Sequence, residues 1–239
     1  MRLLFKILFS AITAAFLSSC LFLGPSVKGN GEVVEQVRDL GEFNGVKVTS
    51  GLNVQLVQGD ETKVAVVADE NLQKVIETKV IGGTLEIRAL ANIWSATSKK
   101  VVITTNNLRE IKGTAGSDIS TDGQLIVDQL NIHASAGSNF MMDLEGQYIE
   151  ISISSGANVF LSGKSKQLIA RSSSGANLKA EDFKAEISDV KVSSGSNVWV
   201  TTMKELTAHA SSGGNIFCYG KPSKTNTTTS SGGNVTQRE

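Results

Sequence analysis

Two kinds of side chain in this chain could support catalysis: two histidines, His133 and His209, and two acidic pairs, Asp60-Glu61 and Asp69-Glu70. Enzymes that cleave polysaccharides need carboxylates gathered in one groove, where they act as acid, base or nucleophile. Both pairs flank predicted turns, so we expect them to be solvated. No Cys/His ligand spacing, phosphate-binding loop or nucleophile elbow is present. The sequence therefore predicts no catalytic residue, no cofactor and no metal site, which makes a polysaccharide-active enzyme the least favoured interpretation.

The two cysteines have different expected roles. The first 19 residues carry two early positive charges and a short apolar run, and they end in Leu17-Ser18-Ser19 before Cys20. This arrangement resembles the cleavage site of bacterial lipoproteins, which predicts a signal peptide over 1–19 and lipidation of Cys20. A transmembrane helix is disfavoured because the apolar run is short for a bilayer. By resemblance to Gram-negative lipoproteins, Leu21 favours the outer membrane, on its periplasmic or cell-surface side. Cys218 is expected to be a buried apolar side chain.

A tetrapeptide of the form Ser/Ala-Gly-small-Asn/Asp recurs seven times in the second half of the chain. Its glycines are separated by 21, 19, 19, 20, 18 and 19 residues and stand at Gly116, Gly137, Gly156, Gly175, Gly195, Gly213 and Gly232. Between the copies apolar and polar residues alternate, as in Ile149, Ile151 and Ile153, which is the pattern of a strand with one buried face. The repeats, over about 113–236, predict an all-β, right-handed parallel β-helix (β-solenoid) with about 19 residues per coil.

Alignment on the glycines assigns a direction to each register position. Apolar residues recur five and three positions before the glycine and three and five positions after it, so these positions should face the core. Gly and Asn tolerate the left-handed backbone region, which predicts a turn at each tetrapeptide. The asparagines are expected to form a structural turn ladder of side-chain hydrogen bonds between coils. They are Asn139, Asn158, Asn177, Asn197, Asn215 and Asn234.

The histidines share an outward register position. His133 and His209 both stand four residues before a glycine and are four coils apart. At about 4.8 Å per strand this places them about 19 Å from each other. They therefore cannot share a metal ion or a proton.

A candidate partner-binding surface follows from another outward position, four residues after the glycine. We call this column the outer stripe; it contains Met141, Phe160, Trp199 and Phe217, interrupted by Lys179. Contiguous exposed apolar surface often marks a contact site. The stripe is predicted to bind a partner protein, another copy of the chain or a sugar polymer. Alternatively, the first β segment or the Asn92-Ile93-Trp94 loop covers it.

The rest of the chain frames this coil. Residues 20–40 are expected to form a polar tether. The β-rich segment that follows is expected to close the upper end of the coil, because open strand edges invite pairing with other chains. It contains a relative of the repeat at Ser50-Gly51-Leu52-Asn53 and a predicted hairpin around Gly82-Gly83. The balance of 23 basic and 23 acidic residues argues against nucleic acid as a partner.

Several segments together resemble a known family. They are Gly41-Glu42-Phe43-Asn44-Gly45-Val46, Val54-Gln55-Leu56-Val57-Gln58-Gly59-Asp60, Ala68-Asp69-Glu70-Asn71-Leu72, Gly83-Thr84-Leu85-Glu86-Ile87 and the recurring Ser-Gly-Ala-Asn coils. The combination is similar to the DUF2807 family, the GIN domain or autotransporter adhesin head, over 41–236. The resemblance implies a parallel β-helix in a secreted or lipid-anchored protein and supplies no catalytic residue.

These observations lead to one favoured function. We expect a non-catalytic, lipid-anchored cell-envelope protein, an adhesin or binding module that presents the β-helix surface to a protein or glycan partner. Its N-terminal lipid would attach it to the membrane. The alternative is a structural envelope protein that self-assembles into homo-oligomers.

Overall fold

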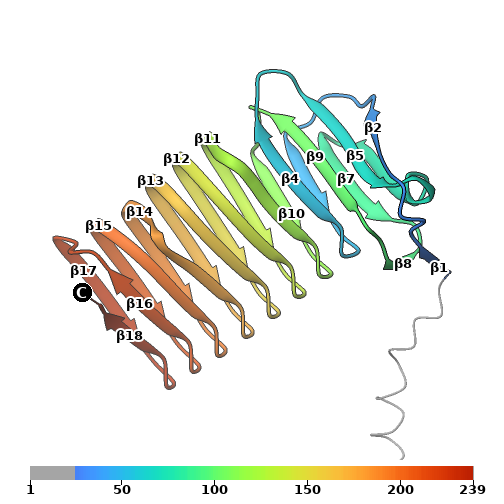
Figure 1. Cartoon of the computed structure of the whole chain (residues 1–239). Helices are drawn as coiled ribbons and strands as arrows, with labels where there is room; N and C mark the ends of the chain where they lie inside the picture. The colour runs from blue at the N-terminus through green and yellow to red at the C-terminus, as the bar shows by residue number, and fades with distance from the viewer. Residues whose placement is uncertain (1–24, 239) are drawn as a thin grey trace, which may run out of the picture.

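The computed structural model describes residues 25–238, which form a β-solenoid closed at one end by shorter strands (Figure 1). The expected signal peptide over 1–19 and Cys20 lie outside the described residues. Besides one 3₁₀ turn, η1 (Glu70–Leu72), the elements are all strands. They are β1 (Ser26–Lys28), β2 (Val33–Arg38), β3 (Gly45–Val48), β4 (Asn53–Gln58), β5 (Lys63–Asp69), β6 (Ile76–Ile81), β7 (Thr84–Ala89), β8 (Asn92–Ser95), β9 (Lys99–Thr105), β10 (Glu110–Gly113), β11 (Asp118–Ala134), β12 (Asn139–Ile153), β13 (Asn158–Ser172), β14 (Asn177–Val192), β15 (Asn197–Ala210), β16 (Asn215–Tyr219), β17 (Lys224–Thr229) and β18 (Asn234–Gln237).

The solenoid consists of long strands stacked in parallel. Strands β11 to β15 each run around most of one coil, and each pairs in parallel with the next. Equivalent residues of successive repeats are direct partners, as Asn158 is of both Asn139 and Asn177. The predicted all-β solenoid with a period near 19 residues is therefore confirmed.

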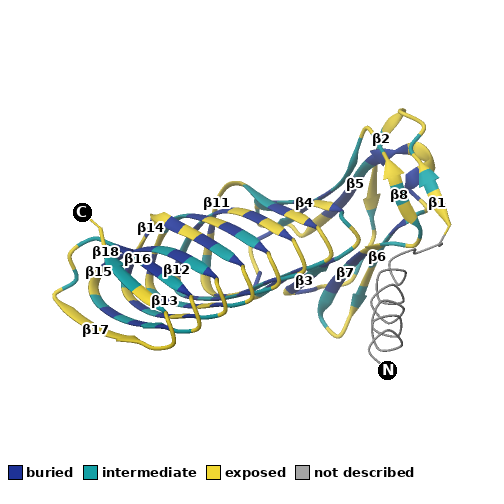
Figure 2. Ribbon diagram, turned by 90° about the horizontal axis from the view of Figure 1, so that it is seen from below, coloured by how far each residue is buried: buried dark blue, intermediate teal, exposed yellow. Residues whose placement is uncertain are grey.

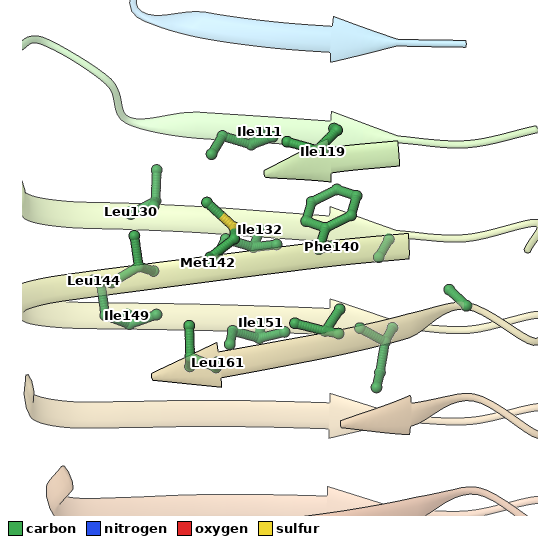
Figure 3. Close-up of a cluster of buried hydrophobic side chains, with 14 of the residues drawn as sticks. Ile111, Ile119, Leu130, Ile132, Phe140, Met142, Leu144, Ile149, Ile151 and Leu161 are labelled. Atoms are coloured by element: carbon green, nitrogen blue, oxygen red, sulfur yellow. The ribbon is translucent and has the colours of Figure 1, made fainter. Parts of the chain in front are cut away.

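The core lies inside the coils and follows the predicted alternation. Side chains three residues after the glycines of the first six copies, such as Phe140, Val159 and Leu178, are buried, and Val235 of the last copy is partly buried. The side chains that alternate with these positions along each strand are more exposed. Figure 2 shows the result as alternating buried and exposed bands along each coil. In Figure 3 the buried side chains of successive coils, among them Ile132 and Ile151, stack along the solenoid. One coil cannot enclose its own apolar residues, so stacking provides the burial that stabilises the fold.

The residues that adopt the left-handed backbone in the turns differ from those expected. In each copy the two residues with positive φ are the glycine and the Ser or Ala before it, for example Gly156 (φ 71°) and Ser155 (φ 53°). The N–H of Ala157 donates to the carbonyl of Ser154 at 3.1 Å, which closes a β-turn around these two left-handed residues. Asn158 lies outside the left-handed region as the first residue of β13. The prediction that Asn provides the left-handed backbone was wrong, because the turn ends one residue before it.

The turns of successive coils are aligned in one row (Figure 1). The N–H of Gly156 donates to the carbonyl of Ser174 in the next coil at 3.1 Å, and the N–H of Gly175 does the same to Ser194. These bonds continue the strand ladder through the turns, so backbone groups that a bend would leave unpaired are satisfied.

The capping portion enters the stack out of sequence order. Strands β3 and β4 pair with β10 and the first part of β11, and Gly51 in the turn between them donates to the carbonyl of Ala115 at 3.0 Å. On their other side lie β7 and β9. The chain thus adds the coil of β7 and β9 outside that of β3 and β4 before it returns to begin β10.

Antiparallel strands then end this side of the solenoid. Strand β5 pairs with β9, β2 pairs with β5, and β6 pairs with β7 through the predicted Gly82-Gly83 hairpin. A change from parallel to antiparallel pairing stops the coil from continuing. The predicted N-terminal capping portion is therefore confirmed.

Part of the expected tether belongs to the fold. Within 20–40, β1 pairs with β8 and β2 pairs with β5. The sequence concealed this because most side chains of β2 are exposed, so its strand is held by backbone hydrogen bonds rather than by a buried apolar face.

Asp69 differs from its predicted solvated state: it is fully buried. Its carboxylate accepts backbone hydrogen bonds from Ser98 (2.8 Å), Gly31 (2.9 Å) and Thr97 (3.2 Å). These bonds, that of Ser98 foremost, hold the pKa of Asp69 below its ordinary value. A Cβ at Gly29 would lie 2.0 Å from the carboxylate, so only glycine fits at position 29 beside Asp69. Asp60 and Glu61 are exposed as predicted.

The opposite end of the solenoid is open. Strand β17 pairs with β15 and β18 pairs with β16, and neither has a second partner within residues 25–238. All six residues of β17 are exposed, which Figure 2 shows as a continuous exposed strand. Its sequence is Lys-Thr-Asn-Thr-Thr-Thr, so Thr227 and Thr229 stand where the preceding coil has the buried Ala208 and Ala210.

Candidate functional site

The outer stripe is a column of directly paired residues on the wall that follows each turn. Strand pairing aligns Met141 of β12 with Phe160 of β13, then Lys179 of β14, Trp199 of β15 and Phe217 of β16. Met141 is 65% exposed and Phe160 39% exposed, whereas Trp199 and Phe217 are half-buried. The exposed apolar surface is therefore concentrated at the end nearer the capping portion.

Each aromatic ring of the stripe has at least one face covered by another side chain. Trp199 stacks on Phe217 with ring centroids 5.2 Å apart and an interplanar angle of 19°. The guanidinium of Arg238 lies 5.2 Å from the Phe217 ring, and the ammonium of Lys179 lies 5.1 Å from that of Phe160. Cations favour the electron-rich faces of aromatic rings. Trp199 and Phe217 thus stack on each other along the solenoid, and each has one face covered by the other.

Met141 and Phe160 form a ridge between two hollows. One hollow, of about 490 Å³, extends to Gln55 of β4 and Lys100 of β9 and has Ile119 and Phe140 at its apolar base. The other, of about 290 Å³, is lined by polar groups that include Asp143, Ser162 and Glu181. The sequence did not indicate Gln55 and Lys100, because only the out-of-order stacking of the capping portion brings them beside this ridge.

The loop considered as a cover for the stripe lies elsewhere. Residues Asn92–Ser95 form β8, which pairs with β1, and Trp94 is itself 80% exposed. Within the described chain the Met141–Phe160 ridge faces solvent.

The asparagine column forms a chain of side-chain hydrogen bonds between coils. Asn158 donates to Asn139 at 3.2 Å, Asn177 to Asn158 at 3.1 Å, and Asn197 to Asn177 at 3.0 Å. The chain extends to Asp118, which accepts from Asn139 at 2.9 Å, and to Asn215, which donates to Asn197 at 3.0 Å. Asn234 leaves the ladder and donates to Thr236 of its own strand.

The remaining chemically capable residues are dispersed. Strand register places His133 and His209 in one outward column with three residues between them, Ser152, Arg171 and Lys191. Over residues 25–238 no cluster of three or more His, Cys, Asp or Glu side chains could hold a metal ion. Cys218 is buried, and desolvation raises the pKa of its thiol to about 11. None of the helical segments in the described part of the chain is long and apolar enough to cross a membrane.

Comparisons with known proteins agree with this architecture. Crystal structures of a "putative adhesin" from Bacteroides fragilis and one from Parabacteroides distasonis superpose with TM-scores of 0.81 and 0.73 at 17% and 20% identity. Each alignment covers 89% of this chain and all of the other. A "putative lipid binding protein" from Parabacteroides distasonis gives 0.69 at 17% identity over 90% of this chain and all of its own.

At sequence identities of 17–20%, the structural similarity shows that these proteins share a fold with this chain. No curated protein matches the chain. The family model described as "Putative auto-transporter adhesin, head GIN domain" matches residues 42–222, almost all of the capping portion and the coils. The chain therefore belongs to the DUF2807 family.

Proposed function

We propose that this protein is a non-catalytic, lipid-anchored binding module of the cell envelope, and that the Met141–Phe160 ridge is its contact with a partner protein. The family and the solved neighbours are described as adhesins, which supports a binding role and an envelope location. The lipidation pattern at Cys20 supports attachment to the outer membrane, with the partner on its periplasmic or cell-surface side.

One observation carries the choice of partner: the ridge is exposed, but ring faces beside it are covered by other side chains. A sugar ring binds an aromatic side chain by packing its C–H groups on the ring face. Trp199 and Phe217 each cover a face of the other, and Lys179 lies over a face of Phe160. Met141 is unbranched and adaptable, and methionine is favoured at protein-binding surfaces. An apolar ridge between two hollows thus suits the side chains of a protein better than a glycan.

Site-specific photo-crosslinking in intact cells tests this proposal. A benzophenone amino acid at Phe160 should give an adduct with one envelope protein, and the same group at Ile126, which is 60% exposed outside the stripe, should not. Glycan adducts at Phe160 would show that the ridge binds a sugar polymer instead of a protein. Equal adduct patterns at Phe160 and Ile126 would overturn the stripe as a binding surface.

A second candidate function, self-assembly, is favoured by the open end of the solenoid. Strands β17 and β18 each present one edge with no strand beside it in the described chain, and such edges can pair with another copy. Sedimentation of the chain lacking residues 1–19, with Cys20→Ala, would show oligomers that grow with concentration. Thr227→Pro removes one backbone donor from β17 and should shift these oligomers toward the monomer. A monomer at all concentrations excludes this alternative.

The anchor is tested separately. Metabolic labelling with a palmitate analogue should label the wild-type protein and leave Cys20→Ala unlabelled, because the thiol is the acceptor. Labelling of the Cys20→Ala protein would show that the lipid is not attached at Cys20.

A further inference from the structure

A groove on the other wall of the solenoid, before each turn, belongs to neither the outer stripe nor the asparagine ladder. It has a volume of about 560 Å³ and follows the stacked coils from β11 to β15. We call it the basic groove. Its outward side chains come from two register positions, four and two residues before each turn glycine: His133, Ser135, Ser152, Ser154, Arg171, Ser173, Lys191, Ser193, His209 and Ser211.

Basic side chains recur along this groove. Strand pairing aligns Lys112, His133, Ser152, Arg171, Lys191 and His209 in that order, one residue per coil. The Lys and Arg side chains that line the groove itself are Arg171 and Lys191, on neighbouring coils. At about 4.8 Å per coil the row extends over about 24 Å. The groove is lined by no carboxylate among the described residues. Two cations on neighbouring coils, with a serine on every coil beside them, suit an anionic polymer that lies along the groove better than a single small anion.

Carboxylates stand two residues before this row on three coils, at Glu110, Glu150 and Asp189. Glu110 pairs with Lys112 at 2.8 Å and lies 3.7 Å from His133, and Glu150 lies 3.9 Å from Arg171. Lys191 is exposed and forms no ion pair within residues 25–238. Its charge is therefore available to a ligand, and Arg171 is held only by a long contact at an exposed site.

The serines beside the cations are also available. Ser135, Ser154, Ser173, Ser193 and Ser211 are half-buried, and in the described chain their hydroxyls form no hydrogen bond. The amide column after the turn uses its polar groups for the ladder, as in the 3.1 Å bond between Asn177 and Asn158. The serine column instead offers one unused donor and acceptor per coil.

We propose that the basic groove binds an acidic polysaccharide lying along the solenoid axis. The carboxylates of such a chain would pair with Arg171 and Lys191, and its hydroxyl and ring oxygens would hydrogen-bond to the serine hydroxyls. Single-stranded nucleic acid fits less well, because sites for it combine basic charge with large aromatic platforms, and no Phe, Tyr or Trp side chain lines this groove. A membrane surface fits less well because no large apolar side chain projects outward here to insert into it.

The residues of one coil should bind the polysaccharide only weakly, and the affinity should increase with the number of coils that the polymer contacts. Exposed charge pairs contribute little individually. A polymer that contacts several coils gains from linked contacts, whose effective concentration is high once the first has formed. Binding should therefore depend on polymer length and weaken as salt screens the charges, since the Debye length falls from about 8 Å at 0.15 M to about 3 Å at 1 M.

Affinity electrophoresis of the detergent-purified full chain through gels that contain polygalacturonate tests the proposal. The wild-type protein should be retarded, and Arg171→Gln/Lys191→Gln should lower the affinity about tenfold. The matched control is Lys164→Gln/Lys204→Gln, which removes two exposed lysines outside the groove. Ser173→Ala/Ser193→Ala should weaken binding at unchanged net charge, and dextran, a neutral polymer, should not retard the protein.

Four outcomes would overturn the proposal: no retardation, equal loss in the groove and control variants, tighter binding to a single-stranded oligonucleotide, or tighter binding to vesicles that contain phosphatidylglycerol. The last two would assign the groove to nucleic acid or to a lipid surface. Because the groove and the ridge lie on different walls, Phe160→Ser should leave polygalacturonate binding unchanged, so the result is independent of the proposed protein partner.

Discussion

The carboxylate of Asp69 accepts a hydrogen bond of 2.8 Å from the backbone N–H of Ser98, across the segment that joins β8 to β9. The same carboxylate holds Gly31 at the start of the fold. One buried side chain thus connects the first strands of the chain to the outermost coil of the capping portion. The stack of parallel coils must be covered at its end, and this connection helps to hold the covering strands in place.

Asp69 should make the stability of the capping portion depend on pH. Its pKa in the folded state lies below the ordinary 3.8, because backbone N–H groups stabilise the ionised form. The folded state therefore gains stability from this group above about pH 3.8 and loses it as the pH falls through the lower, folded pKa. The measurement is the midpoint of thermal unfolding from pH 7 to pH 2 for wild type and Asp69→Asn.

The two midpoints should differ most at neutral pH and converge in acid. Asp60→Asn changes an exposed carboxylate in the loop between β4 and β5 and is the control. A difference between wild type and Asp69→Asn that stayed constant down to pH 2 would contradict the role assigned to the ionised form.

Replacing Ser174 by Asn should stabilise the solenoid. Ser174 has a φ of 56°, and the left-handed region costs a residue with a Cβ about 1–2 kcal/mol, a cost that Asn reduces through local hydrogen bonding. We expect a gain of about 0.5–1 kcal/mol in the free energy of unfolding, measured by denaturant titration. Ser173→Asn, one residue earlier and outside the left-handed region, should change stability by less than about 0.5 kcal/mol. Equal effects at the two positions would contradict this account.

Asn177→Ala should destabilise the fold by about 1–3 kcal/mol. The side chain donates to Asn158 and accepts from Asn197, so its removal breaks two hydrogen bonds worth about 0.5–1.5 kcal/mol each. The comparison is Asn234→Ala, because Asn234 stands at the same register position but lies outside the ladder. Denaturant titration of both variants measures the difference. Similar losses would show that the ladder adds nothing beyond the local turn.

Cys218 should be nearly inert in the folded protein. A thiol with a pKa of about 11 is ionised at pH 8 in only about one part in a thousand, and the side chain is also buried. In a Cys20→Ala chain, where Cys218 is the remaining cysteine, Ellman's reagent should react over hours in buffer and within minutes in denaturant. Rapid reaction of the folded chain would show that the last coils open readily.

The repeats could be predicted because their information is local. The alternation of apolar and polar residues within one strand is enough to place Phe140 and Val159 in the core, whatever residues the neighbouring coil contains. A glycine such as Gly156 marks each turn. The column of Met141, Phe160, Trp199 and Phe217 was also predictable, since equal spacing along the chain becomes alignment across parallel strands.

The amino-acid sequence by itself determined the coil, its inward positions and its turns, because strand alternation and left-handed glycines act within a few residues. Only the tertiary structure decided what depends on neighbours distant in sequence. Asp69 became a buried acceptor because three separate backbone N–H groups converge on it. The faces of Trp199 and Phe217 became occupied because side-chain torsions, which spacing does not specify, turned the rings onto each other. Strands β7 and β9 pair outside β3 and β4 rather than next to β10, an order that the sequence does not specify because backbone hydrogen bonds can join any two strands in register.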